Sequence, residues 1–141
     1  MTDITTHVTV RLDFGQLTRL GPGKTRLLEL IAEHGSISAA GRAMGMSYRR
    51  AWLLVDSLNQ AFREPVVGTR PGGKADKRAE LTAFGLEVVA RYRAIEAAAR
   101  RAIAHDLKFL EGAIKENARP RVMRDLSDTD PLGWAEPPQL P

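Results

Sequence analysis

A serine, a tyrosine and two arginines stand together at positions 47–50, where a segment with helical apolar periodicity begins. Arginine can donate two hydrogen bonds to O6 and N7 of guanine, while serine and tyrosine hydroxyls can donate to phosphate oxygens. A helix N-terminus also attracts phosphate, because its first backbone N–H groups have no partner within the helix. Ser47, Tyr48, Arg49 and Arg50 are therefore candidates for contacting double-stranded DNA from the first turn of a helix.

A second basic group lies downstream, around the pair Gly72-Gly73, and consists of Arg70, Lys74, Lys77 and Arg78. Glycines let such a loop adapt its backbone to a ligand surface. The segment from residue 42 to residue 78 carries a net charge of +5, whereas the whole chain carries +4, so the rest of the chain is slightly acidic. We expect this basic loop to lie over the DNA backbone or in the minor groove.

The elements that must position these side chains can be read from periodicity and capping signals. An apolar stripe precedes Gly35, which suits the left-handed position at a helix C-terminus. Ser36 can cap a short helix that ends before the turn residue Gly45, and Ser47 can cap the next helix. Three helices in this order, with a short middle one, predict a helix-turn-helix, which places Ser36 among the candidate DNA contacts as well.

Two stretches of β-type sequence flank these helices. Residues 8–14 alternate apolar and polar side chains, which predicts a short strand. The helix that opens at Ser47 must end near Pro65, because the residue before a proline disfavours helical geometry. Val66-Val67 and residues 79–81 then predict a hairpin whose loop, residues 68–78, holds the second basic group. Trp52 is expected to pack against this hairpin or against the first helix.

The remaining regular element is a long helix that Thr82 can cap and that runs to about Gly112. Apolar residues recur three or four positions apart along it, and a helix of this length exceeds the rest of the domain. A second copy of the chain is the expected partner for this stripe, which makes the protein a homodimer. The expected interface residues are Val88, Tyr92, Ile95, Ala99, Ile103 and Leu107.

The predicted fold class is thus mainly α with a small β wing: a winged helix-turn-helix followed by a long dimerisation helix. Residues 1–81 form the DNA-binding domain, residues 82–116 form the dimerisation helix, and residues 117–141 form an acidic, proline-rich tail that we expect to be irregular.

Enzyme, metal and membrane functions find no support in the sequence. Cysteine is absent, the three histidines lie far apart, and we expect neither a metal nor a cofactor. The segment 21–25, Gly-Pro-Gly-Lys-Thr, resembles part of a phosphate-binding loop, but Thr18 stands where that motif needs glycine. We found no signal peptide or membrane-spanning run, so the expected location is the cytoplasm.

The order of residues in this region resembles the N-terminal domain of ModE-type molybdate-responsive transcription regulators. The resemblance covers roughly residues 8–112. It rests on Gly35-Ser36-Ile37, Ala39-Ala40, Gly45, Ser47-Tyr48, Ala51-Trp52, Gly72-Gly73-Lys74 and Leu81-Thr82 with Gly85. It implies a winged helix-turn-helix of the LysR-like kind, dimerised through the long helix. It also implies binding to operators of molybdate-transport or molybdoenzyme genes.

Members of that family continue into a molybdate-binding region of paired β-barrel modules, for which the tail of this chain is too short. The resemblance therefore implies DNA binding and dimerisation without a ligand-sensing domain, and a separate sensor protein is a possible partner. The alternative is a dimeric helix-turn-helix that binds protein rather than DNA, or that serves as the accessory partner of such a sensor.

Overall fold

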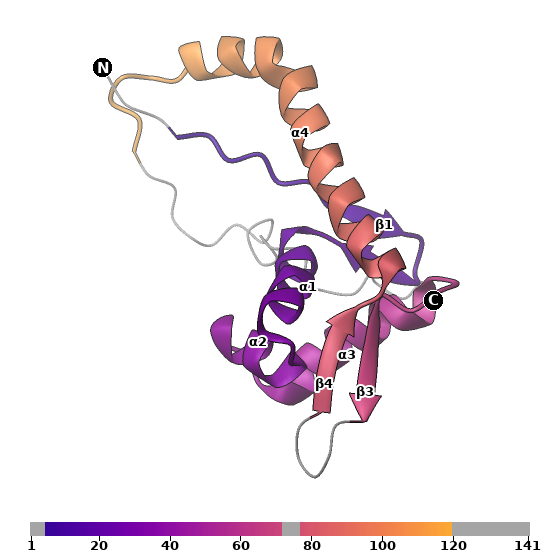
Figure 1. Ribbon diagram of the computed structural model, residues 1–141. Coiled ribbons are helices and arrows are strands. Elements are labelled where there is room, and N and C mark those ends of the chain that lie inside the picture. The colour runs from indigo at the N-terminus through magenta and orange to yellow at the C-terminus, as the bar shows by residue number, and fades with distance from the viewer. Residues whose placement is uncertain (1–4, 72–76, 120–141) are drawn as a thin grey trace.

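The computed structural model describes residues 5–71 and 77–119 of the chain. They form four helices and two separate two-stranded antiparallel sheets, so the expectation of a mainly helical protein with little β structure is confirmed. Figure 1 shows the elements, which follow the order β1 (Leu12–Phe14), β2 (Thr18–Leu20), α1 (Pro22–His34), α2 (Ile37–Ala43), α3 (Tyr48–Ala61), β3 (Val67–Pro71), β4 (Lys77–Leu81) and α4 (Ala83–Gly112).

The first sheet differs from the single strand expected over residues 8–14. Only Leu12–Phe14 is extended and paired, and its partner is β2, which the sequence reading missed. Gly15 makes the turn between them with a φ of 55°, and the backbone N–H of Leu17 donates to Phe14. β2 has only three residues, which is too short for an alternation pattern to be recognised.

The capping residues of the three short helices behave as expected. Gly35 has a φ of 70° and its N–H closes α1 on the carbonyl of Ile31. Ser36 accepts a hydrogen bond from Ala39 at the start of α2, and Gly45, with a φ of 71°, turns the chain toward α3. Each cap gives an orphan backbone group of a helix end a partner.

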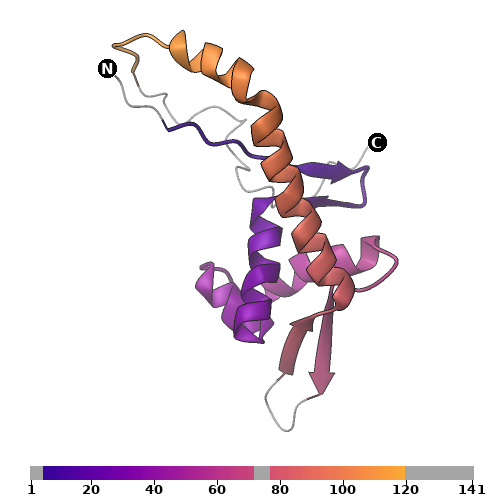
Figure 2. The same ribbon diagram turned by 45° about the horizontal axis from the view of Figure 1, so that its top comes forward.

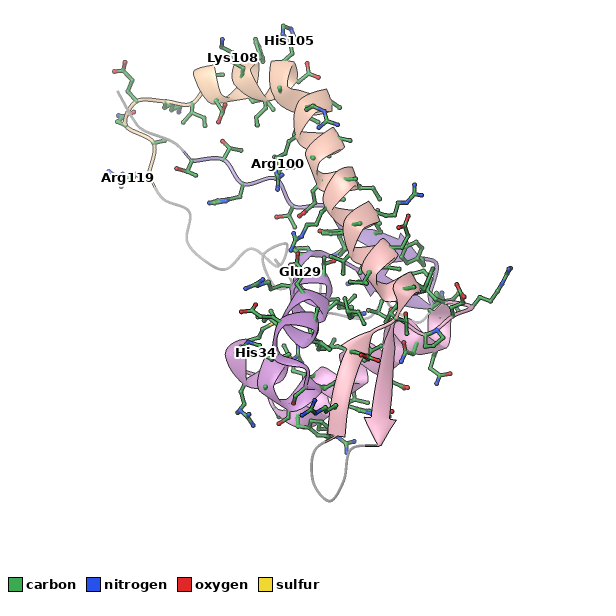
Figure 3. The ribbon with its side chains drawn as sticks, viewed as in Figure 1. Glu29, His34, Arg100, His105, Lys108 and Arg119 are labelled. Carbon is green, nitrogen blue, oxygen red and sulfur yellow. The ribbon has the colours of Figure 1, made fainter. Side chains whose placement is uncertain are left out.

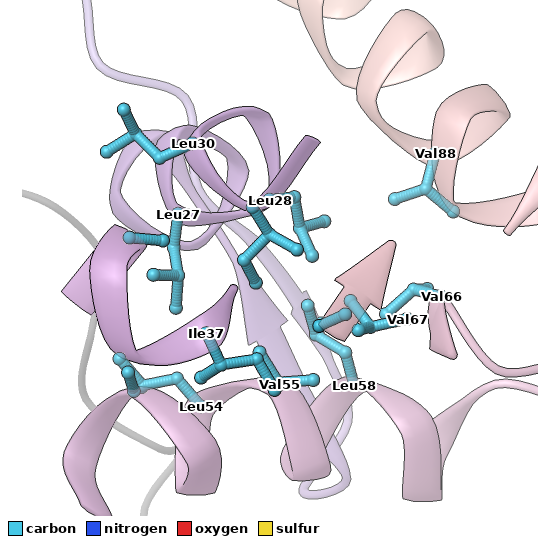
Figure 4. Close-up of a cluster of buried hydrophobic side chains, with 14 of the residues drawn as sticks. Leu27, Leu28, Leu30, Ile37, Leu54, Val55, Leu58, Val66, Val67 and Val88 are labelled. Atoms are coloured by element: carbon cyan, nitrogen blue, oxygen red, sulfur yellow. The ribbon is translucent and has the colours of Figure 1, made fainter. Parts of the chain in front are cut away.

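The core lies between α1 and α3 and is closed by the start of α4. Figure 4 shows Leu27 and Leu28 of α1 facing Leu54, Val55 and Leu58 of α3, all of them buried. Each such side chain contributes about 1.5–3 kcal/mol by leaving water. This packing fixes the orientation of α3 relative to the rest of the chain.

The hairpin β3–β4 is longer than expected, because its strands extend to Pro71 and Lys77, into the stretch assigned to the loop. It is attached to the helices at two places. The N–H of Ala79 in β4 donates to the carbonyl of Gly35, between α1 and α2. The amide of Asn59 in α3 accepts from the N–H of Val66 at 2.7 Å and donates to the carbonyl of Val67.

Helix α4 begins against the hairpin and then leaves the body of the protein. Thr82 caps it by accepting from the N–H of Gly85, as expected. A Cβ on Gly85 would lie 2.0 Å from the carbonyl oxygen of Val66, so only glycine permits this close approach. In Figures 1 and 2, the far half of α4 and the ends of β3 and β4 that are remote from it lie on opposite sides of the molecule.

Candidate nucleic-acid interface

The first turn of α3 presents its side chains to solvent. Ser47 is the N-cap, and its Oγ accepts a hydrogen bond from the backbone N–H of Arg50 at 3.1 Å. Tyr48, Arg49 and Arg50 are all exposed, while the next residue, Ala51, is fully buried. Among the described residues, the guanidinium of Arg49 has no hydrogen-bond or ion-pair partner. The cap thus holds a polar and basic turn at the surface, with one arginine available for a ligand.

Trp52 is not packed as we expected. Its side chain is 44% exposed and that of Leu53 is 47% exposed, so both lie on the outer side of α3. Residues 51, 54, 55 and 58 take all the buried positions of this helix, and helical spacing leaves 52 and 53 on the opposite side. That spacing is a usable signal for Trp52, but tryptophan is largely buried in most proteins, which favoured the packed interpretation.

The start of α2 lies beside the hairpin. The hydrogen bond between Ala79 and Gly35 places β4 next to the residue that precedes Ser36. The hydroxyl of Ser36 already accepts from Ala39 and the residue is half-buried, so its candidate contact would come from the remaining hydroxyl proton. Arg42, at the other end of α2, is exposed and donates to Ser38.

The predicted basic tip of the hairpin is described only in part. Arg78 is exposed and pairs in register with Arg70, and Lys77 pairs with Pro71. The side chains of Arg70 and Lys77 and the whole of Lys74 lie outside the described part of the structure. The backbone therefore brings Arg70, Lys77 and Arg78 to the far end of the hairpin, which projects beyond the helices in Figures 1 and 2.

Two residues of the expected dimer interface lie elsewhere. Val88 is buried and Tyr92 is fully buried, and both belong to the core of this chain because α4 packs on α1 over its first turns. The hydroxyl of Tyr92 donates to the carbonyl of Val10 at 2.7 Å. Burial, together with the charge of Glu96, raises the pKa of Tyr92 to about 12. These two side chains are therefore too buried to contact a second copy of the chain.

The other four interface candidates lie further along the helix. Ile95 is exposed, and Ala99, Ile103 and Leu107 are half-buried. Arg100, His105 and Lys108 mark the same half of α4 in Figure 3, where it extends away from the other helices. The segment 5–11 runs beside α4, since the hydroxyl of Thr6 donates to Glu111 and the carbonyl of Val10 accepts from Tyr92. Of the apolar stripe, Tyr92 contacts the chain's own N-terminal segment.

A charged group within the α1–α4 contact was not anticipated. Glu96 is only 6% exposed, and Arg93 bonds both to it, at 2.7 Å, and to Glu29 of α1, at 2.6 Å. Hydrogen bonding to Glu29 raises the pKa of Arg93 above its ordinary value. Figure 3 labels Glu29 on α1. No sequence signal marked this group, because glutamate and arginine at helical spacing are typical of a solvated surface.

The segment that resembles a phosphate-binding loop has a structural role. Pro22 is the first residue of α1, and Lys24 is fully buried with its Nζ donating to Thr18 and Ser57. The strand that precedes this segment, β2, is antiparallel to β1, whereas a phosphate-binding loop follows a parallel strand. Within residues 5–71 and 77–119, no three acidic, histidine or cysteine side chains are grouped so that they could hold a metal ion. No helix in that same part has the length and apolar character to cross a membrane.

Part of the chain is similar in sequence to known molybdenum-related proteins. The chain is 38% identical over 96 residues to the molybdenum-pterin-binding protein MopA of Rhodobacter capsulatus, which is 68% of this chain and 35% of MopA. It is 39% identical over 85 residues to the molybdenum transport protein ModE of Azotobacter vinelandii, which is 60% of this chain and 32% of that protein. It is 35% identical over 71 residues to the DNA-binding transcriptional dual regulator ModE of Escherichia coli K12, which is 50% of this chain and 27% of that protein.

The chain is a homologue of the ModE and MopA proteins. It spans about a third or less of the length of these curated relatives. No protein-family model matches the chain. The relatives are described as binding, transport and regulatory proteins, and none of the three is described as an enzyme.

Proposed function

We propose that this protein is a sequence-specific DNA-binding transcription regulator that acts as a homodimer. In this proposal α1, α2, α3 and the β3–β4 hairpin form a winged helix-turn-helix within residues 1–81. α3 is the recognition helix and enters the major groove, and the hairpin is the wing. Residues 82–116 supply the dimerisation helix, and residues 117–141 are a separate tail.

The observation that carries this proposal is the first turn of α3. Ser47 caps the helix, and the following Tyr48, Arg49 and Arg50 are exposed. The opposite side of α3 packs into the core through its buried apolar stripe, and Asn59 bonds to the backbone of Val66 just before the hairpin. Recognition helices read base edges with the side chains of their N-terminal turns, so the basic residues stand where guanine contacts are needed.

The β3–β4 hairpin supports the same placement of α3 on DNA. Arg78 is exposed at its far end, and the backbone of Arg70 lies opposite it in the register. The bond from Ala79 to Gly35 keeps β4 beside the start of α2, so the wing and the helix pair cannot move independently. Arg70, Lys74, Lys77 and Arg78 contact phosphates in this proposal, and Ser36 contributes from the N-terminus of α2.

The dimer forms through the part of α4 that extends away from the body. Ile95, Ala99, Ile103 and Leu107 are the contact residues in this proposal, since Val88 and Tyr92 are used within each chain. A twofold dimer binds two half-sites related by the same symmetry, so the operator is an inverted repeat.

We further propose that the regulated genes concern molybdate transport or molybdoenzymes. Support comes from the relatives, one of which is a molybdenum transport protein and another a molybdenum-pterin-binding protein. Response to an effector is tested separately, by repeating the DNA titrations with added molybdate.

Selection of bound fragments from the source genome, followed by titration of the best duplex, tests the regulator. We expect an inverted repeat near molybdenum-related genes. The logarithm of affinity should fall linearly with the logarithm of salt concentration, by about 0.9 per phosphate contact. Arg78→Ala should make this slope less steep, while Arg101→Ala on distal α4 should leave it unchanged. Absence of any enriched fragment at low salt would refute the regulator.

A protein-interaction module, or an accessory partner of a sensor protein, is the second candidate. The exposed Trp52 and Leu53 on α3 favour it, because large apolar side chains at a surface often mark protein contacts. The two candidates differ in salt response. The affinity for a protein bound through these apolar side chains should change little between low and moderate salt. The affinity for DNA should fall steeply over the same range.

A further inference from the structure

Trp52 and Leu53 form one patch with Tyr48 and Arg49 on the outer side of α3, which we call the α3 patch. Residues four apart on a helix lie one above the other, so Trp52 follows Tyr48 and Leu53 follows Arg49. Tyr48, Trp52 and Leu53 are each 44–47% exposed. None of the four has a hydrogen-bond or ion-pair partner among the described residues. The patch therefore combines a cation, two large apolar groups and two hydrogen-bond donors.

We propose that Trp52 and Leu53 recognise the C5 methyl groups of thymine in the operator. This inference rests on the proposed DNA-binding function and adds a base preference to it. The major groove displays one apolar group, the thymine methyl, and apolar side chains on a recognition helix distinguish thymine through it.

The position of the two residues along α3 fits this role. Leu53 is the sixth residue of α3 and so lies within its first two turns, the part of a recognition helix that reaches base edges. Arg49 lies one turn closer to the N-terminus on the same side. When Arg49 bonds to a guanine, Leu53 reaches a base pair further along the groove, so the α3 patch predicts a guanine followed closely by thymines in each half-site.

Charge identifies DNA rather than another protein as the occupant of this surface. The apolar side chains are bordered by the exposed Arg49 and Arg50, and Arg42 is exposed on the neighbouring helix. No residue in the described part of the chain accepts from the indole N–H of Trp52 or the hydroxyl of Tyr48, and both donors suit phosphate oxygens at the edge of the groove. Gln60 is also exposed on α3, but it lies about two turns beyond Trp52 and donates to Asp56, so it serves as the control outside the α3 patch.

The test removes single methyl groups from the DNA. The full chain is titrated against the duplex that it selects from a random-sequence library, and against copies in which one thymine at a time is replaced by deoxyuridine. Pairing is unchanged by this replacement, and only the C5 methyl is lost. We expect wild-type affinity to fall about four-fold at one or two positions per half-site, as the loss of one buried methyl predicts.

Side-chain truncation supplies the second half of the test. Leu53→Ala should weaken binding to the thymine duplex, and it should no longer distinguish thymine from deoxyuridine at the position that Leu53 contacts. Trp52→Ala should do the same at a neighbouring position, and Gln60→Ala should retain the full preference. Thermal melting shows whether each variant remains folded, which we expect because the replaced side chains are exposed.

Specific binding with equal affinity for every deoxyuridine duplex would overturn this inference and leave the DNA-binding function standing. A preference that persists in both Leu53→Ala and Trp52→Ala would also overturn it. If the chain selects no sequence from the library, the proposed function itself fails, and the inference fails with it.

Discussion

The guanidinium of Arg93 in α4 lies 2.6 Å from a carboxylate oxygen of Glu29 in α1, and its other side bonds to Glu96. This contact joins the long helix to the first helix, immediately beyond the buried Tyr92. It therefore helps to set the direction in which α4 leaves the body. In the proposed dimer joined through α4, that direction would set the distance between the two α3 helices.

Arg93→Gln should destabilise the protein by about 2 kcal/mol, because it leaves the buried Glu96 without its cation. The loss is smaller than for a fully buried pair, since Arg93 is partly exposed. Arg91→Gln is the matched control: its pair with Glu87 is exposed, so it should change stability by about 0.5 kcal/mol or less. Urea unfolding measures both, and equal losses would show that the Arg93 bridge is not structural.

Gly85→Ala should cost about 3 kcal/mol of stability, because the added Cβ meets the carbonyl oxygen of Val66 and forces the hairpin away from α4. Gly112→Ala has open space around it and should be neutral or stabilising by up to about 1 kcal/mol. Thermal unfolding of the two variants compares them directly. A Gly85→Ala protein as stable as wild type would contradict this close approach of α4 to Val66.

Stability at alkaline pH should depend on Tyr92. Its pKa is about 12 in the folded protein against 10 for the unfolded chain, so the unfolded state loses its proton first. This contribution is complete below pH 10 and is lost as the pH rises toward 12, a change of up to about 3 kcal/mol. Tyr92→Phe should remove this part of the pH dependence and cost about 1 kcal/mol at neutral pH, through the lost bond to Val10. Urea unfolding at several pH values checks this, with the exposed Tyr48→Phe as control.

Arg49→Ala and Arg50→Ala should each weaken binding to the operator by about 1–3 kcal/mol and weaken binding to random DNA less. The reason is that a bidentate contact with guanine is lost only on the specific site. Titration of the selected duplex and a random duplex at one salt concentration makes the comparison. Equal losses on both duplexes would reassign these arginines to phosphate contacts.

Ile95→Asp should shift the protein toward monomer, because it places a charge in the proposed interface. Leu86→Asp is the control, since Leu86 is exposed on the opposite side of α4. Sedimentation equilibrium measures the mass of each variant. A dimer that survives Ile95→Asp would move the contact to the apolar end of the helix, where Phe109 and Leu110 are exposed.

Local signals in the sequence predicted the helices and their ends well. The serine and threonine caps, the glycines after α1 and α2, and the apolar stripe of α3 each act within about one helical turn, so neighbouring residues are sufficient to specify them. The exposure of Ser47, Tyr48, Arg49 and Arg50 followed from the same periodicity, since a capped helix with one buried stripe must turn its polar first turn outward.

Contacts between distant segments were decided only by the tertiary structure. A buried Glu96 depends on Arg93 and Glu29 meeting across two helices, and the burial of Val88 and Tyr92 depends on α4 starting against the core. Trp52 lies at the surface because four smaller residues fill the inner side of α3. A single helix shows which residues share a side, but only its neighbours determine how much of that side they cover, and these long-range contacts leave no local pattern in the chain.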